Sequence, residues 1–136
     1  MSLTLAKLSD LKAGYSPSIR VGEIPFAVAR QLRLLNHNVY LSASSLTHIL
    51  RDHPDIDLFT LLELPFAIGQ GLLVQERRKP HIILSCYQSS VHQRRFIVAM
   101  KTAANGTETW VSSFYKSRAR QTRSVLNRGN ILKPHD

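Results

Sequence analysis

The stretch that decides the fold is residues 95–115, RFIVAMKTAANGTETWVSSFY. In its first half Phe96, Val98 and Met100 alternate with their neighbours, which is the two-residue period of a β-strand. Asn105-Gly106 is a strong signal for a hairpin, because these two residue types accept the positive φ angles of tight turns. The sequence therefore predicts two antiparallel strands, the second of which runs through residues 107–115.

Further elements are predicted on both sides of this hairpin. Residues 72–76 and 82–87 look like two more strands that flank a basic turn, and the Arg-rich segment after Ser117 looks like a helix. Before residue 72 we expect helices, with short strands at residues 20–22 and 39–41, and Pro65 and residues 69–71 are expected to end the last of these helices. We therefore expect an α+β fold: N-terminal helices packed on an antiparallel meander of about four strands, then a basic C-terminal helix or tail.

Positive charge is concentrated in the second half of the chain. The 136 residues include 18 Lys and Arg against 9 Asp and Glu, which gives a net charge of +9 and a pI near 10.3. Residues 1–68 carry six basic and six acidic groups, whereas residues 69–136 carry twelve and three. A one-sided positive field favours a polyanionic partner, since phosphate neutralisation releases counterions. The alternative is a solvated basic surface that keeps the protein soluble.

Composition excludes several classes of protein. Hydrophobic residues make up 43% and charged residues 20%, as in an ordinary globular domain. No apolar run approaches the roughly 20 residues that span a bilayer, and the N-terminus does not resemble a signal peptide, so we expect a cytoplasmic protein without a membrane partner. The single cysteine, Cys86, excludes an intrachain disulfide and a cysteine zinc site. The absence of a Gly-rich phosphate loop leads us to expect no cofactor.

Two histidines, His48 and His53, lie in and just after a predicted helix that Pro54 closes. A spacing of five residues places them about 140° apart on a helix, so they do not form a metal-binding pair, and we expect no metal. Histidine can transfer protons near neutral pH, which makes both residues candidates for acid–base catalysis. The alternatives are a half-buried His48 bonded to the backbone and a His53 that interacts with the helix dipole.

The hairpin supplies further candidate catalytic residues. Counting in twos places Ser113 and Tyr115 on one face of the second strand and Ser112 on the other face with Trp110, while Lys101 ends the first strand. A lysine, hydroxyl groups and a histidine on one face would suit metal-free RNA cleavage. In that reaction a base takes the 2′-OH proton, a cation stabilises the phosphorane and an acid protonates the 5′-oxygen. The alternative is that Lys101 and Ser113 simply face solvent. Spacing alone leaves the choice between the two serines open.

A set of basic residues near the hairpin has few acidic neighbours, which favours contact with phosphate over salt bridges within the protein. We predict that the nucleic-acid-binding residues are Arg94, Arg95, Lys116, Arg118, Arg120 and Arg123.

Five short motifs occur in order over about residues 20–116. They are Val21-Gly22-Glu23-Ile24-Pro25, Val39-Tyr40-Leu41-Ser42, the segment Leu46-Thr47-His48-Ile49-Leu50 with His53-Pro54-Asp55, Ala99-Met100-Lys101-Thr102, and Trp110-Val111-Ser112-Ser113-Phe114. In these motifs the chain resembles the phage-associated branch of the barnase–EndoU–colicin–RelE-like (BECR) nuclease superfamily. Domains of this kind often end phage head-morphogenesis proteins or occur in polymorphic toxins.

The resemblance implies a metal-independent endoribonuclease of toxin or phage type, with its site on the open face of the sheet. By position, it implies that His48 is the general base or acid and that His53 is its partner or orienter. It further matches Lys101 to the strand lysine that stabilises the phosphate, and Ser113, with Ser112 one residue away, to the hydroxyl of the last strand. We add Tyr115 as a second candidate for the hydroxyl donor.

We expect one domain over residues 1–136, divided into an arm (1–18), a nuclease-like core (19–116) and a basic C-terminal helix or tail (117–136). The expected partners are RNA, tRNA included, and an acidic immunity or antitoxin protein. The resemblance places the protein in a bacterial or phage-encoded setting, with delivery into a target cell as one route. The alternatives are a non-catalytic nucleic-acid-binding module and a phage structural or interaction protein with a basic tail.

Overall fold

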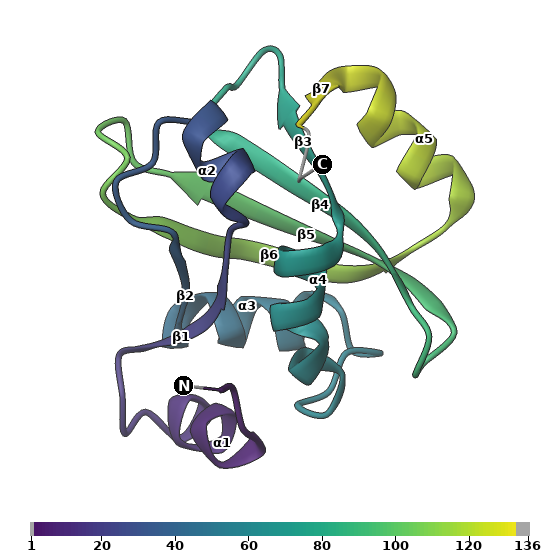
Figure 1. Ribbon diagram of the computed structural model, residues 1–136. Helices are drawn as coiled ribbons and strands as arrows, with labels where there is room; N and C mark the ends of the chain where they lie inside the picture. Colours follow the sequence, from purple (N-terminus) through teal and green to yellow (C-terminus); the bar gives the residue numbers. More distant parts are fainter. Residues whose placement is uncertain (1, 133–136) are drawn as a thin grey trace.

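The computed structural model describes residues 2–132 of the chain. Within these residues the predicted hairpin lies at the centre of one seven-stranded sheet, with the strand order β1-β2-β6-β5-β4-β3-β7 (Figure 1). The strands are β1 (Ser18–Glu23), β2 (Asn38–Ser42), β3 (Leu72–Glu76), β4 (Ile82–Ser89), β5 (Arg94–Thr102), β6 (Thr109–Ser117) and β7 (Gly129–Ile131).

In the described part of the chain, five α-helices and one 3₁₀ helix accompany the sheet. Helix α4 lies across the sheet, and α5 lies beside β3 and β7 (Figure 1). None of the described helices is both long enough and apolar enough to cross a membrane. The helices are α1 (Leu5–Ala13), α2 (Phe26–Gln31), α3 (Ala43–Asp52), the 3₁₀ helix η1 (Thr60–Glu63), α4 (Leu64–Gln70) and α5 (Ala119–Arg128).

The predicted α+β class is confirmed, but the sheet is larger than the expected four strands. Strands β3 to β6 pair antiparallel in sequence order, and β1, β2 and β7 extend the sheet at both ends. Strand β2 joins β6 in parallel through only two residue pairs, Val39 with Thr109 and Tyr40 with Trp110. The sheet is therefore mixed. So short a parallel contact leaves no periodic signal in the sequence from which it could be predicted.

The segments at both ends of the chain differ from the arm and tail that we expected. Residues 5–13 form α1, whose Leu8 and Leu11 are buried in the core and not part of a loose arm. After α5 the chain returns to the sheet, where β7 pairs antiparallel with β3. Residues 133–136 of the predicted tail lie outside the described residues. Pro65, which we expected to end a helix, instead stands in the first turn of α4, where proline is well tolerated.

The inner face of the sheet carries the main core. Phe96, Val98 and Met100 are fully buried there, as their alternation predicted. Phe114 of β6 stacks on Phe96 with 5.1 Å between ring centroids, and Leu46 of α3 belongs to the same buried cluster. Helices α1 to α4 all contribute buried residues to this cluster, so they cover the inner face. This packing fixes β5 and β6, and with them the side chains that point to the opposite face.

Asp57 holds the loop from α3 to η1 in place. Its Oδ1 accepts hydrogen bonds from the Thr60 backbone N–H (2.8 Å) and the Thr60 hydroxyl (2.7 Å). These bonds hold the pKa of the Asp57 carboxyl below its usual value. A lowered folded-state pKa means that this stabilisation is present above the unfolded pKa of about 4 and is lost as pH falls through the folded value.

We therefore expect Asp57→Ala to lower the free energy of unfolding by about 1 kcal/mol at pH 7. The difference from the wild type should shrink below about pH 4, as the wild-type carboxyl is protonated. Chemical denaturation at several pH values measures this effect. Asp57→Asn, which keeps an acceptor oxygen but loses the charge, is the matched control and should approach the wild-type stability only below about pH 4. An Asp57→Ala deficit that does not change with pH would contradict the role of the charge.

Candidate active site and nucleic-acid interface

The outer face of the sheet, opposite helices α1 to α4, presents the candidate hydroxyl and lysine residues. Strand pairing arranges its side chains in rows that run across β4, β5 and β6. The first row is Cys86–Ile97–Tyr115, the second is Leu84–Ala99–Ser113, and the third is Ile82–Lys101–Trp110. Helix α5 covers part of the first two rows, because Val125 is buried in one cluster with Leu84 and Ile97. Lys101, Ser113 and Tyr115 therefore share one face, in three successive rows.

A β-bulge in β6 separates the two serines. Ala99 pairs with Ser113 and Met100 with Val111, so Ser112 is the extra residue. The Ser112 hydroxyl donates a hydrogen bond to the Ala99 carbonyl (3.1 Å), which leaves Ser113 as the serine in line with Tyr115. Because of this extra residue, the side chains of β6 before the bulge point to the face opposite to the one that counting in twos predicts. Trp110 therefore lies on the face of Lys101, and our placement of Trp110 with Ser112 was wrong.

His53 meets Tyr115 at the edge of this face. Ser42 caps α3 by accepting a hydrogen bond from the Ser45 backbone N–H, and His53 ends the helix seven residues after the buried Leu46. Seven residues are two helical turns, so His53 lies on the inward-facing side of α3. Its ring stacks on the Tyr115 ring with 5.3 Å between centroids and 23° between planes.

The environment of Tyr115 suits it to be a hydroxyl donor. Burial raises the pKa of its hydroxyl, and the nearby positive charge of Arg128 opposes this shift only in part. The hydroxyl therefore keeps its proton at neutral pH. It can donate that proton to an oxygen that gains negative charge, but it is not suited to act as the base.

His48 lies on the other side of α3 and is exposed. Its Nδ1 is 2.6 Å from Nη2 of Arg51, and Nε of Arg51 is 3.0 Å from Oδ1 of Asp52. Because the guanidinium can only donate, Nδ1 acts as the acceptor and the proton of the neutral ring is on Nε2. Among the described residues His48 makes no other hydrogen bond. The helix thus places His53, and not His48, against the strand that carries Ser113 and Tyr115.

A basic groove begins next to the His53–Tyr115 pair. It is a depression of about 820 Å³, and five cationic side chains line it with one carboxylate, Asp55. Asp55 follows His53 by two residues, and Lys116, directly after Tyr115, lies 4.0 Å from it (Nζ to Oδ2). The cations are Arg94, Lys116, Arg118, Arg120 and Arg123, which are five of the six predicted nucleic-acid-binding residues. The sixth, Arg95, is exposed and pairs with Ser117 at the end of the groove.

Lys101 is further from the pair than we expected. It is exposed on the third row, four residues along β5 from Ile97, the strand partner of Tyr115. At the rise of a β-strand this is about 13 Å. Lys101 and Ser113 are diagonal neighbours, but Lys101 and Tyr115 do not converge on one point. Of the groove cations, Lys116 is the direct chain neighbour of Tyr115.

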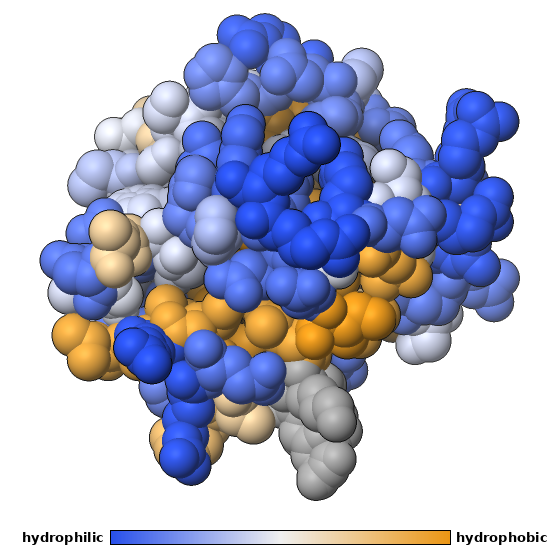
Figure 2. All heavy atoms as spheres, turned by 90° about the horizontal axis from the view of Figure 1, so that it is seen from above, coloured by the Kyte–Doolittle hydropathy of each residue, from blue (hydrophilic) through white to orange (hydrophobic). Residues whose placement is uncertain are grey.

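Figure 2 looks down on the end of the molecule that is uppermost in Figure 1, and hydrophilic side chains cover most of it, with a hydrophobic band across it.

Some basic residues outside the groove form hydrogen bonds that stabilise the fold. Arg77, in the β3–β4 turn, donates hydrogen bonds to the carbonyls of Asn127 and Gly129, which ties this turn to α5 and β7. Its neighbours Arg78 and Lys79 are exposed. These two residues lie outside the basic groove and serve below as controls for it.

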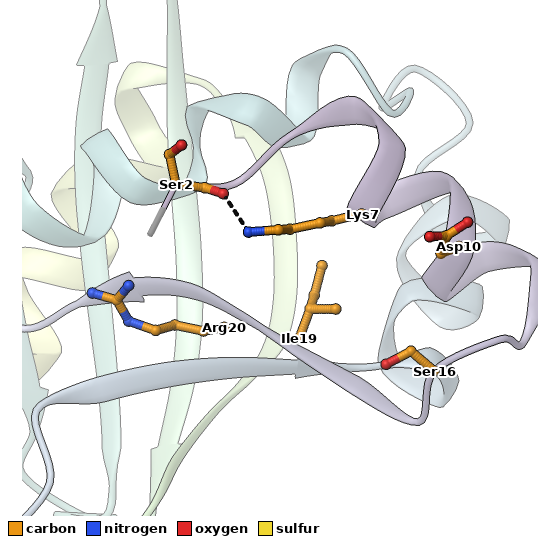
Figure 3. Close-up of a pocket in the computed structure, with 6 residues that line it drawn as sticks. All are labelled: Ser2, Lys7, Asp10, Ser16, Ile19 and Arg20. Carbon is orange, nitrogen blue, oxygen red and sulfur yellow. Dashed lines mark hydrogen bonds between the residues drawn. The ribbon is translucent and has the colours of Figure 1, made fainter.

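A second cavity, of about 410 Å³, lies between α1 and β1 (Figure 3). Its two cations are engaged within the protein: the Lys7 ammonium donates to the Ser2 carbonyl (2.8 Å), and Nε of Arg20 donates to Oδ1 of Asn38 (2.7 Å). It has two cations to one carboxylate, Asp10, whereas the basic groove has five cations to one carboxylate. This cavity is therefore a weaker candidate for a phosphate-binding site than the basic groove.

Within residues 2–132 no cluster of three or more His, Cys, Asp or Glu side chains is placed to hold a metal ion. No protein-family model, curated protein or solved structure matches the chain. Assignment of the site therefore depends on the geometry of this chain itself.

Sequence reasoning missed two features of this region. One is Arg128, which comes close enough to Tyr115 to affect its pKa although they lie on different elements. The other is an aromatic pair on the outer face, Tyr40 with Trp110 (5.6 Å between centroids). No local pattern could reveal this pair, because it depends on the parallel β2–β6 contact and on the bulge.

Proposed function

We propose that the protein is an endoribonuclease that cleaves RNA without a metal ion, at the His53–Tyr115 pair, with the RNA backbone held in the basic groove. The observation that carries this proposal is the stacking of the His53 ring on Tyr115, a pair whose chain neighbours Asp55 and Lys116 line the groove. A proton-transfer group beside a phosphate-binding surface is the combination that RNA cleavage needs.

In the proposed reaction the ribose 2′-oxygen attacks the adjacent phosphorus while His53 takes the 2′-OH proton. The bond from phosphorus to the 5′-oxygen breaks, and the Tyr115 hydroxyl gives its proton to that oxygen. Ser113 and the groove cations donate hydrogen bonds to the charged phosphorane. The products are a 2′,3′-cyclic phosphate and a 5′-hydroxyl. Proton transfer from His53 back to Tyr115 through water then restores both residues.

The BECR resemblance belongs to this proposal. In it, residues 19–116 are the nuclease-like core, strands β3 to β6 are its four-strand meander, and residues 117–136 are the basic C-terminal segment. The protein is then a toxin or phage-type ribonuclease that acts on cytoplasmic RNA such as tRNA. An acidic immunity or antitoxin protein would inhibit it by covering the groove cations, because its carboxylates would compete with phosphate.

The chemistry of the product ends tests the proposal. Discrete RNA fragments should carry 2′,3′-cyclic phosphates and 5′-hydroxyls, as read by mass spectrometry. An oligonucleotide with a 2′-deoxyribose at the cleaved nucleotide should bind but stay intact, since it lacks the attacking oxygen. Cleavage of that oligonucleotide would show that the 2′-OH is not the nucleophile.

The groove cations should set the salt dependence of binding. For single strands the slope of log K against log salt changes by about 0.7 per phosphate contact. Replacing Arg118, Arg120 and Arg123 together by Gln should therefore reduce this slope by about 2 and weaken binding to every RNA sequence alike. Fluorescence anisotropy of labelled RNA measures both effects. Replacing Lys12, Arg78 and Lys79 by Gln is the matched control, and an equal loss there would contradict a specific role for the groove.

The separation of Lys101 from Tyr115 favours a second candidate function, a non-catalytic nucleic-acid-binding module. In that case RNA binds the groove with the same salt dependence, but no fragments appear at any pH. A histidine-dependent enzyme should instead show a bell-shaped pH–rate profile across about pH 5–8. The pH profile of cleavage therefore distinguishes the two functions, whereas the salt dependence of binding does not.

A further inference from the structure

We infer that Tyr40 and Trp110 form a platform on which a nucleobase of single-stranded RNA stacks, at the far end of the outer face from the His53–Tyr115 pair. This inference rests on the proposed function and adds to it, because it specifies a substrate with an unpaired, splayed base. Aromatic side chains on an open sheet face are the usual means of holding single-stranded bases.

The platform lies on the third row of the outer face. Tyr40 pairs with Trp110 across the parallel β2–β6 contact, and Trp110 pairs with Lys101 across β5 and β6. Tyr40 lies between Val39 and Leu41, whose side chains are buried on the inner face, so the Tyr40 ring points outward. Tyr40 and Trp110 therefore stand side by side on the outer face, with an exposed cation in the next strand.

These rings are not part of either buried hydrophobic cluster, and both remain partly exposed. The indole Nε1–H donates a hydrogen bond to Oε1 of Glu108 (2.7 Å), which satisfies its only polar group. The exposed part of Trp110 is then apolar ring surface, which suits a base more than a phosphate. The exposed Lys101 ammonium beside it suits the phosphate attached to that base.

The position of the platform fits the proposed cleavage site. Trp110 and Tyr115 are five residues apart on β6, with one residue taken up by the bulge, so they lie about 13–16 Å apart. One extended strand of RNA can therefore place a base on the platform and, a few nucleotides away, a phosphate at His53. Lys101 lies directly across from Trp110, at the platform end of that path, which gives it a binding role although it is distant from Tyr115.

The alternative role for the aromatic pair is structural, because it also bridges a parallel contact of only two residue pairs. A test must therefore separate base stacking from stability. Trp110→Phe keeps a ring at the contact, and Tyr40→Leu fills the space without an aromatic face. Both can be checked against the wild type by thermal melting before binding is measured.

Trp110 is the single tryptophan of the chain, so its fluorescence reports directly on the platform. We would titrate the wild type with a single-stranded RNA oligonucleotide whose riboses are 2′-O-methylated, which blocks cleavage by removing the nucleophile. Stacking predicts quenching of Trp110 fluorescence by this oligonucleotide, and much weaker quenching by its fully paired duplex. Unchanged Trp110 fluorescence at saturation would overturn the inference.

Anisotropy with the same labelled oligonucleotide should show a 5- to 150-fold weaker affinity for Trp110→Ala, as expected for the loss of one stacked base. Tyr40→Leu should also weaken binding, and Trp110→Phe should retain most of the affinity. The salt dependence should not change, because the phosphate contacts remain. Tyr15→Ala, which removes a tyrosine that is 83% exposed in the α1–β1 loop, is the matched control.

The inference is overturned if Trp110→Ala and Tyr40→Leu bind the oligonucleotide as tightly as Tyr15→Ala does. It is also overturned if these two substitutions weaken binding of the duplex as much as binding of the single strand. These outcomes are independent of the proposed function, since the oligonucleotide cannot be cleaved. Stacking without any cleavage of ordinary RNA would support the platform and reject the nuclease. Cleavage of ordinary RNA without stacking would support the nuclease and reject the platform.

Discussion

The His53→Ala protein should fold normally and bind RNA, yet cleave it about 100 to 10,000 times more slowly than the wild type. General acid–base catalysis contributes a factor of this size, and His53 is the histidine that stacks on the Tyr115 ring beside the basic groove. Binding should change by no more than a few-fold, because the cations that hold phosphate are unaffected. Single-turnover cleavage rates, with anisotropy for binding, separate these two effects.

His48→Ala is the matched control, since it removes the same ring five residues away on the same helix. His48 is exposed and its Nδ1 accepts a hydrogen bond from Arg51, so this variant should cleave within a few-fold of the wild-type rate. The resemblance implied the larger role for His48. If His48→Ala is inactive and His53→Ala is active, the assignment from geometry is wrong and the one from the resemblance is right.

Phe114→Ala should lower the free energy of unfolding by about 3–5 kcal/mol. Phe114 and Phe96 are fully buried and stack with 5.1 Å between centroids, so the deletion leaves a cavity in the centre of the core. This is a large part of the 5–15 kcal/mol that stabilises a typical domain, and the melting temperature should fall by about 10–20 °C. Urea denaturation and thermal melting measure both quantities.

The control for Phe114 is Phe59→Ala, the same deletion at a side chain that is 65% exposed. It should cost less than about 1 kcal/mol, because little apolar surface returns to water. Equal losses at the two positions would contradict the placement of Phe114 in the core. Phe114 also anchors β6 from its inner side, so a destabilised Phe114→Ala protein should lose RNA cleavage on warming before the wild type does.

The central hairpin and its buried face were predictable because their pattern is local. Phe96, Val98 and Met100 alternate over one strand, and the structure buries all three. The joining of β2 to β6 was not predictable, since two residue pairs in parallel leave no trace in a window of sequence. The same holds for α1, which is amphipathic only through Leu8 and Leu11 and whose position depends on contacts with distant elements.

In the candidate site, too, local patterns were predictable from the sequence and long-range contacts were not. All five groove cations were among the basic residues predicted from the sequence: four cluster in one segment, residues 116–123, and the fold brings Arg94 of β5 next to them. The choice between Ser112 and Ser113, and the face occupied by Trp110, depended on a one-residue bulge that counting in twos cannot detect. The helical spacing predicted that His48 and His53 lie on different sides of the helix. Which of the two faces inward depended on how the helix packs.

The central claim is most directly tested by incubating total bacterial RNA with the purified protein in EDTA and separating the products on a denaturing gel. The wild type should produce discrete fragments without added metal. His53→Ala, purified in the same way, should leave the RNA intact, which excludes a contaminating nuclease as the source of the fragments. Intact RNA with the wild-type protein, accompanied by a shift in a binding assay, would contradict the nuclease and leave the nucleic-acid-binding module as the function.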